Sequence, residues 1–330
     1  MIGARLALLP PEGGPLDGCA SALVLHPTAA ADLPGFSPYS TTIMQPFKPA
    51  QDAWANRGYA VAPTASDDLR CDVALVCLPR SKVEAFALIA QAAQSASQVL
   101  IDGQKTDGVE SVLKAVKTRH IPAGVISKAH GKLFWLTDVD SSTFADWAAG
   151  PALTDGGFWT APGVFSADGI DPASAMLADV LPDRIGARVA DLGAGWGFLS
   201  AHILTRPDVS HLDVVEAHHM ALACAEHNIT DNRAQFHWAD ATTWRPDTPV
   251  DAVVINPPFH TDRKPDPALG QAFIKAAARM LKPNGHLWMV ANRHLPYEDV
   301  LSETFTKIVD LGGDARFKLL VAERPRKTRR

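Results

Sequence analysis

The chain has 330 residues, of which 47% are hydrophobic and 20% are charged, and its formal net charge is −5. This composition is that of an ordinary globular protein, and the length predicts two domains that can each bury a core. No apolar run is long enough for a transmembrane helix, and the negative charge excludes a general nucleic-acid binder.

The metal-binding and redox residue types follow no recognisable pattern. The four cysteines are scattered without zinc spacing, which indicates reduced thiols in the core of a cytoplasmic protein. The twelve histidines include the adjacent pair His218 and His219, but adjacent residues on a helix point in different directions. We therefore expect no metal site.

The first half of the chain alternates short apolar runs with helical patterns. Strands are predicted at 21–26, 72–78 and 98–102, and helices at 82–96 and 108–117. This alternation favours a parallel α/β sheet. A further strand is predicted at 131–136. No glycine-rich loop follows any of these strands. We therefore expect residues 1–150 to be a domain without a cofactor site, with a structural or substrate-positioning role, and place the catalytic domain at 151–330.

The second domain is predicted to begin with a loop and a short helix. The loop at 163–171 is rich in turn-forming residues, and Asp171 is suited to cap a helix over 172–180. Phe165 in this loop is a candidate lid residue, although anchoring the linker in the core explains it equally well.

A strand at 189–192 then leads into three alternate glycines, Gly193, Gly195 and Gly197, and a helix. Glycines let the backbone turn tightly and approach a ligand closely. The dinucleotide fingerprint fails, because Phe198 stands at its last position. Asp191 and these glycines instead resemble the first motif of S-adenosylmethionine-dependent methyltransferases.

Two further strands end in acids at the spacing of βα units. Glu216 ends the strand at 212–216 and can accept both ribose hydroxyls of an adenosine, with a surface position at the start of a helix as the alternative. Asp240 ends the strand at 234–239 and can accept from an adenine amine, with a capping role as the alternative.

The apolar run 253–255 ends in Asn256, Pro257, Pro258, Phe259 and His260. Two prolines cannot donate ladder hydrogen bonds, so the strand must stop and hold Asn256 at the carboxyl edge of the sheet, where open α/β folds bind ligands. The Asn256 side-chain oxygen, the Pro257 carbonyl and the Phe259 ring suit a planar group with an NH2. An ordinary strand-ending turn is the alternative.

The last part of the chain is predicted to complete the sheet. Helices are expected at 266–281 and 296–305, with strands at 286–291, 307–311 and 317–322. Five positive charges follow in the tail, among them Arg324, Arg326 and Lys327. The tail is either a solvated end or an arm that contacts phosphates.

These motifs together resemble the bacterial ribosomal RNA guanine-N2-methyltransferases, above all the small-subunit enzymes. The resemblance rests on residues 162–169, 256–260, 291–297 and 316–318 and is faint before residue 150. It implies two tandem Rossmann-like class I domains, of which only the second keeps the cofactor site. Trp196 departs from the family pattern, because a small residue is usual there.

The resemblance implies methyl transfer from S-adenosylmethionine to the exocyclic N2 of a guanine in 16S ribosomal RNA, by a monomeric cytoplasmic enzyme without metal or membrane. The implied catalytic residues are Asn256, Pro257 and Phe259. The implied cofactor residues are Asp191, Gly193, Gly195, Gly197, Glu216, Asp240 and Asn256. Substrate contacts are expected from Phe165, His260, Arg324, Arg326 and Lys327.

Other functions fit the same motifs. Large-subunit guanine-N2, protein glutamine and adenine N6 are alternative methyl acceptors. A non-catalytic RNA-binding assembly factor with the same fold is an alternative of another class.

Overall fold

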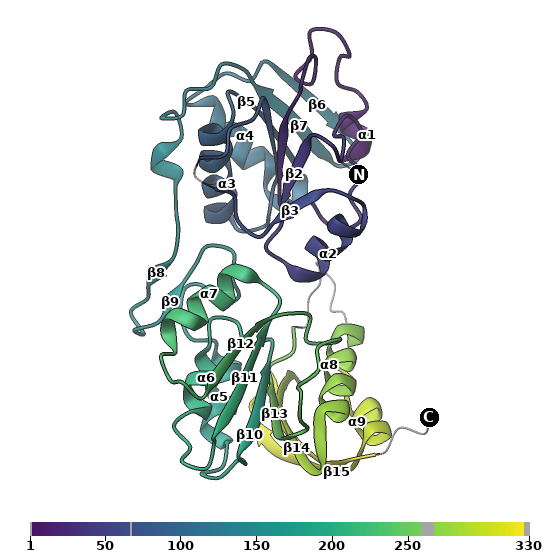
Figure 1. Ribbon diagram of the computed structural model, residues 1–330, viewed down its shortest axis with the longest axis vertical. Helices are drawn as coiled ribbons and strands as arrows, with labels where there is room; N and C mark the ends of the chain where they lie inside the picture. Colours follow the sequence, from purple (N-terminus) through teal and green to yellow (C-terminus); the bar gives the residue numbers. More distant parts are fainter. Residues whose placement is uncertain (1, 67, 259–266, 327–330) are drawn as a thin grey trace. The chain divides into compact units, whose positions relative to one another are not determined.

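The computed structural model describes residues 2–66, 68–258 and 267–326. The chain divides into two compact units (Figure 1). The first contains Met1–Pro151 and Ala161–Gly163, and the second contains Ala152–Thr160 and Val164–Arg330.

The first unit is built on a seven-stranded sheet with the order β3-β2-β1-β4-β5-β7-β6. Strands β1 to β5 are parallel to one another, whereas β7 is antiparallel to both β5 and β6. The strands are β1 Ala22–Leu25, β2 Thr41–Met44, β3 Ala60–Ala62, β4 Val73–Cys77, β5 Gln98–Gln104, β6 Gly124–Lys128 and β7 Gly131–Leu136. The helices are α1 Gly3–Leu6, α2 Lys48–Asn56, α3 Lys82–Ser95 and α4 Val109–Lys117, with 3-10 turns η1 Lys105–Asp107 and η2 Ala145–Trp147.

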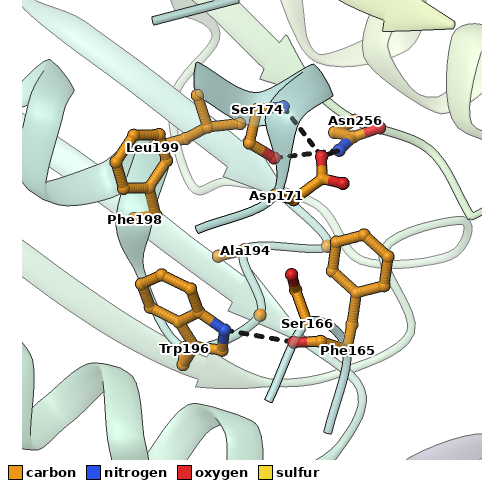
Figure 2. Close-up of a pocket in the computed structure, with 11 residues that line it drawn as sticks. Phe165, Ser166, Asp171, Ser174, Ala194, Trp196, Phe198, Leu199 and Asn256 are labelled. Atoms are coloured by element: carbon orange, nitrogen blue, oxygen red, sulfur yellow. Dashed lines mark hydrogen bonds between the residues drawn. The ribbon is translucent and has the colours of Figure 1, made fainter. Parts of the chain in front are cut away.

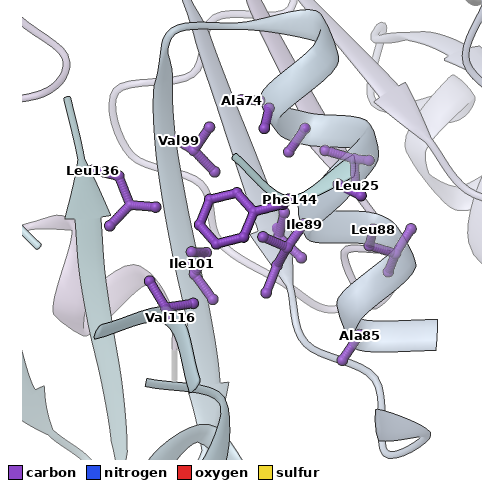
Figure 3. Packing of buried hydrophobic residues seen from close by; sticks show 14 of the residues in the cluster. Leu25, Ala74, Ala85, Leu88, Ile89, Val99, Ile101, Val116, Leu136 and Phe144 are labelled. Carbon is purple, nitrogen blue, oxygen red and sulfur yellow. The ribbon is translucent and has the colours of Figure 1, made fainter. Parts of the chain in front are cut away.

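Both faces of this sheet are covered, which explains why its central strands are continuous apolar runs. Helices α3 and α4 pack on one face, where Phe144 lies fully buried among Ile89, Val99 and Leu136 (Figure 3). Helices α1 and α2 contribute to the core of the other face, which includes the fully buried Trp54.

The second unit repeats the same arrangement. Its main sheet has the order β12-β11-β10-β13-β14-β16-β15, and β8 pairs with β9 in a separate two-stranded sheet. The strands are β8 Ala152–Leu153, β9 Trp159–Thr160, β10 Arg188–Leu192, β11 His211–Glu216, β12 Ala234–Trp238, β13 Val250–Ile255, β14 Leu281–Asn292, β15 Phe305–Gly313 and β16 Phe317–Pro325. The helices are α5 Pro172–Val180, α6 Phe198–Ile203, α7 His219–Asn228, α8 Pro267–Met280 and α9 Glu298–Thr304. Residues of α5, α6 and α7 pack on one face of the sheet, and those of α8 and α9 on the other.

The two main sheets correspond strand for strand, so positions in one can be matched to positions in the other. In the first, Leu25 of β1 lies opposite Met44 of β2. In the second, Leu192 of β10 lies opposite Val215 of β11. Gln45, which follows β2, therefore occupies the place that Glu216 has in the second sheet.

The order of the second sheet places the predicted site residues on one edge. Strands β12, β11, β10 and β13 are adjacent and parallel, so their carboxyl ends meet at the same edge. Asp191, Glu216, Asp240 and Asn256 stand at or just after these four ends. The sequence-based expectation of a shared edge is confirmed.

Candidate active site

A pocket opens at this edge of the second unit (Figure 2). Its walls come from the loop before α5, the start of α5, the glycine loop and the end of β13. The residues that line it are Phe165, Ser166, Asp171, Ser174, Gly193, Ala194, Gly195, Trp196, Phe198, Leu199 and Asn256. Predicted site residues from three separate stretches of sequence thus surround one pocket.

The side-chain amide of Asn256 is held in a fixed orientation. Its Nδ2 donates to Oδ2 of Asp171 at 3.0 Å and to Oγ of Ser174 at 2.9 Å. Figure 2 shows the carbonyl oxygen of Asn256 on the side away from these partners. No residue that the structure describes donates to this Oδ1 atom, so it stays available as an acceptor. Pro257 follows and is buried.

Asp171 is the N-cap of α5, as the sequence predicts. Its Oδ2 accepts from the backbone N of Ser174 at 2.8 Å, next to a proline in the first turn. This contact satisfies one of the free N–H groups at the helix start. The role of Asp171 and Ser174 in holding Asn256 was missed, because no local pattern links residues so far apart in sequence.

The glycine loop after β10 requires left-handed backbone at all three glycines. Gly193, Gly195 and Gly197 have φ values of 74°, 58° and 93°, which residues with a side chain rarely adopt. A Cβ on Gly197 would lie 2.8 Å from Ile229 Cδ1, whereas a Cβ on Gly195 would meet nothing within 4 Å. The loop therefore packs tightly against α7 at Gly197 and leaves space beside Gly195.

The Glu216 carboxylate fixes the glycine loop from the neighbouring strand. Oε2 accepts from the backbone N of Gly195 at 2.8 Å, and Oε1 accepts from the backbone N of His218 at 2.7 Å. Burial raises the pKa of Glu216, and these backbone N–H groups act in the opposite direction. A carboxylate has about four lone-pair sites, so both oxygens can still accept from ligand hydroxyls.

Asp191 is buried beneath the loop, with 1% of its surface exposed. Its Oδ2 accepts from Oγ of Ser200 at 2.6 Å. Its Oδ1 is buried and has no hydrogen-bond partner among the residues that the structure describes. Burial raises the pKa of Asp191 to about 7, with the Ser200 hydroxyl lowering it and the charge of Glu216 raising it.

Asp240 closes a turn after β12. Its Oδ1 accepts from the backbone N of Thr242 at 2.8 Å and from Oγ1 of the same residue at 2.7 Å. These two hydrogen bonds are the ones expected if Asp240 caps the turn, which was the alternative to binding an adenine amine. They leave Oδ2 for a ligand, so the adenine role stays a prediction.

Trp196 links the glycine loop to the loop before α5. Its Nε1 donates to the backbone O of Phe165 at 3.1 Å, and its ring is 4% exposed and packs against Phe158 at 5.0 Å between centroids. The Phe165 ring itself is 55% exposed on the pocket wall. The bulky residue of the glycine loop therefore serves as a tether.

Of the predicted substrate residues that the structure describes, Arg324 and Arg326 are not at this pocket. Phe259, His260 and Lys327 lie outside the described residues. Arg324 and Arg326 come at the end of β16, which runs antiparallel to β14 and ends at the opposite edge of the sheet from Asn256. Arg326 Nε donates to the carbonyls of Ser302 and Phe305.

Neither a metal-binding cluster nor a membrane-spanning helix is present among the described residues. Within 2–66, 68–258 and 267–326, no three His, Cys, Asp or Glu side chains are grouped so that they could hold a metal ion. Across the same residues, no helix is long and apolar enough to cross a membrane.

The fold and this edge define the class of protein. Six strands run in one direction, and the antiparallel strand β16 lies between β14 and β15. Together with a glycine loop after the central strand and an acid on the next strand, these are the features of a class I S-adenosylmethionine-dependent methyltransferase. Comparison with known proteins agrees. The model of the methyltransferase small domain family matches residues 155–321.

Relatives and a solved structure narrow the assignment. A ribosomal RNA small subunit methyltransferase C from Hahella chejuensis is 31% identical over 257 residues, 72% of each chain. One from Shewanella oneidensis is 30% identical over 285 residues, 78% of this chain and 82% of the relative. A T. thermophilus 16S rRNA N2 methyltransferase solved with AdoMet and guanosine has a TM-score of 0.76 at 24% identity, over 92% of this chain and 88% of that one, which supports the two-unit fold. The chain belongs to the methyltransferase small domain family, with the small subunit methyltransferases C as its relatives.

Proposed function

We propose that this protein transfers a methyl group from S-adenosylmethionine to the exocyclic N2 of a guanine in 16S ribosomal RNA. The relatives that share two thirds or more of their length with the chain are small-subunit ribosomal RNA methyltransferases. The observation that carries the proposal is the fixed amide of Asn256, which presents an acceptor beside the glycine loop. We further infer a monomer that works in the cytoplasm.

The residues of the edge fit the cofactor. The buried Oδ1 of Asp191 lacks a partner among the described residues and lies beneath a loop with open space at Gly195. Glu216 keeps acceptor sites for ribose hydroxyls. Asp191, the glycine loop, Glu216 and Asp240 would hold S-adenosylmethionine. When bound, it supplies a methyl group on a sulfonium, which a nitrogen can attack directly.

The chain's own residues prepare the acceptor nitrogen. An exocyclic guanine amine is a poor nucleophile, because its lone pair is delocalised into the ring. Hydrogen bonds from its two N–H groups to Asn256 Oδ1 and the Pro257 carbonyl would favour a pyramidal nitrogen and direct its lone pair. Orienting two bound reactants can supply roughly 7–11 kcal/mol of the barrier, so no strong base is needed. Phe259 stays a predicted stacking residue, and His260 a predicted proton acceptor.

We also propose that the first unit is a degenerate methyltransferase domain. At the place of Glu216 it has Gln45, which is 6% exposed. The Gln45 side chain donates from Nε2 to the carbonyl of Pro27 at 2.8 Å and accepts at Oε1 from the backbone N of Phe47 at 2.9 Å. Gln45 thus links the loop after the central strand to the end of its own strand, as Glu216 does. Its side-chain amide has one acceptor oxygen and one donor nitrogen, whereas the Glu216 carboxylate has two acceptor oxygens. Pro27 stands where the second unit has its glycine loop, which supports a role other than cofactor binding.

Methyl transfer from labelled S-adenosylmethionine to 16S RNA and to small subunits from cells lacking the enzyme tests the main proposal. N2-methylguanosine in the digested product is the expected result. Transfer to large-subunit RNA, to a protein glutamine or to adenine would show that the substrate is one of these and not a guanine of 16S RNA. Tight cofactor binding without transfer to any of these would overturn the proposal, and absence of cofactor binding would favour an assembly factor.

A further inference from the structure

Two arginines lie on the same edge of the second sheet as Asn256, on the side away from the cofactor loop. Strand β14 is adjacent to β13 and parallel to it, so both end at this edge. Arg293 follows the last residue of β14. Phe317 begins β16 opposite Asn292, and Arg316 precedes it. We call Arg293, Arg316 and Phe317 the basic corner.

The basic corner is close to the acceptor position. Ile255 lies opposite Met289, so Asn256 is level with Val290 on the neighbouring strand. Arg293 comes three residues further along the chain, which corresponds to about 10 Å at the usual rise per residue. Arg324 and Arg326, in contrast, lie a full strand length away at the opposite edge.

Arg293 is held rigidly without a carboxylate partner. Its backbone N donates to the carbonyl of Arg316 at 2.8 Å. Its Nε donates to the carbonyl of Asp314 at 2.8 Å, and its Nη2 to the carbonyl of Phe317 at 3.0 Å. Nη1 makes no hydrogen bond with the residues that the structure describes, and the residue is exposed. The plane of this guanidinium is thus fixed while a full positive charge faces solvent.

Arg316 adds a second exposed cation beside an aromatic ring. Its guanidinium lies 5.1 Å from the centre of the Phe317 ring, and 65% of its side chain is exposed. The Asp314 carboxylate forms an ion pair with Arg316, 3.6 Å from its Nε, without a hydrogen bond between the two side chains. Oδ1 of Asp314 already accepts from the backbone N atoms of Arg316 and Phe317, both at 2.7 Å. This acid therefore only partly neutralises the corner.

The charges on the edge are segregated. The side formed by β10 to β12 carries Asp191, Glu216 and Asp240, which suits a cationic sulfonium cofactor. The side formed by β14 and β16 carries Arg293 and Arg316, in a chain whose net charge is −5. Glu298, another acid of this region, is already paired with Lys318.

We propose that the basic corner binds the phosphate backbone of the RNA next to the nucleotide whose base reaches Asn256. The fixed guanidinium of Arg293 can contact a phosphate through two donors, which a flexible lysine cannot do as well. The edge of Phe317 and the plane of Arg316 offer a stacking surface for a neighbouring base. This inference rests on the proposed function, because it assumes an RNA substrate.

The test compares Arg293→Ala, Arg316→Ala and the double variant with Arg184→Ala. Arg184 is exposed in the same unit but precedes β10, at the opposite edge. Binding of a 16S RNA transcript is measured over a series of salt concentrations, together with KM and kcat for methyl transfer and the Kd for S-adenosylmethionine. We expect the double variant to bind RNA at least about 10-fold more weakly, with each substitution reducing the salt slope by about one. kcat and cofactor Kd should stay within about twofold, and Arg184→Ala should match the wild type.

The outcomes separate the two proposals. If the wild type transfers methyl groups but the double variant binds RNA with unchanged affinity and salt slope, only the proposed role of the basic corner is overturned. If the corner variants bind RNA more weakly but the wild type transfers no methyl group, the proposed reaction is overturned and the RNA-binding role of the basic corner is kept. If Arg293→Ala loses its thermal transition because the turn at 314–317 loosens, Arg316→Ala decides, since it removes none of the backbone hydrogen bonds of that turn.

Discussion

The side-chain Nδ2 of Asn256 donates to Oδ2 of Asp171, 85 positions earlier in the chain. The same oxygen accepts from the backbone N of Ser174 and so caps α5. One carboxylate therefore starts a helix and determines which end of the Asn256 amide faces away from that helix. Reversing the amide would place two oxygens against each other, so the start of α5 specifies the orientation of the proposed acceptor.

Replacing Asn256 by Ala removes the side-chain acceptor without touching the glycine loop. We expect kcat to fall at least about 100-fold, while the cofactor Kd changes by less than about threefold, because the lost contact acts on the attacking nitrogen. Steady-state kinetics and calorimetric titration measure the two quantities. Asn284→Ala, which is exposed near the beginning of β14 at the other edge, is the matched control. Comparable losses in turnover and in cofactor affinity would make Asn256 a structural residue.

Asp171→Ser separates helix capping from amide orientation. Serine caps a helix about as well as aspartate, so the free energy of unfolding should change by less than about 1 kcal/mol. Its shorter side chain gives up the contact with Asn256, and we expect kcat to fall about 10-fold. Ser174→Ala removes the second acceptor of the Asn256 amide and should have a smaller effect in the same direction. Urea unfolding and kinetics on the same preparations check this, and unchanged turnover in both variants would refute the positioning role.

The buried Asp191 makes stability depend on pH. Burial raises its pKa to about 7 from an ordinary value of 3.8, so the folded protein holds a proton that the unfolded chain releases. The stabilisation from this proton is complete below about pH 4 and is lost as the pH rises to about 7. Between pH 5 and pH 8 the free energy of unfolding of Asp191→Asn should gain about 2–3 kcal/mol relative to the wild type. Urea unfolding at several pH values measures it, and parallel profiles for the two proteins would contradict the prediction.

In the first unit, Arg5 forms a buried ion pair with Asp102. Arg5 is 0% exposed and Asp102 4%, and Nε and Nη2 donate to the two carboxylate oxygens at 2.6 and 2.8 Å. Asp102→Ala leaves an unpaired buried cation and should cost about 3–5 kcal/mol of stability. The double variant Arg5→Met with Asp102→Leu should recover most of this loss, because it removes both charges. Urea unfolding of the full chain measures both. A double variant as unstable as the single one would show that geometry, not charge, dominates.

The sequence predicts much of the catalytic unit, because its strands are apolar runs that end in clear turn formers. The predicted helix at 172–180 has the observed bounds of α5, and strands β10 to β13 lie where periodicity places them. The first unit is harder, since β2 and β3 have only four and three residues, and β2 begins with two polar threonines. Neither these strands nor α2 and β6 were predicted.

The contacts that define the site were beyond local patterns. That Asp191, Glu216, Asp240 and Asn256 share an edge follows from regular βα spacing. The bonds from Asp171 to Asn256 and from Trp196 to Phe165 join residues 85 and 31 positions apart, and only the packed fold brings them together. Likewise, the basic corner depends on β16 lying beside β14, an order that periodicity cannot reveal.

The place of β16 between β14 and β15 has a consequence for protein synthesis. The strand made last pairs with both of them, so until residues 317–325 have been translated β14 has no neighbour on that side. In the first unit the corresponding strand, β7, is made by residue 136. The first sheet can therefore be completed early in synthesis. The second sheet keeps an unpaired side on β14 until its last strand, β16, has been translated. Such an edge invites pairing with other nascent chains, so slow translation or truncation before residue 317 should increase aggregation of the second unit rather than the first.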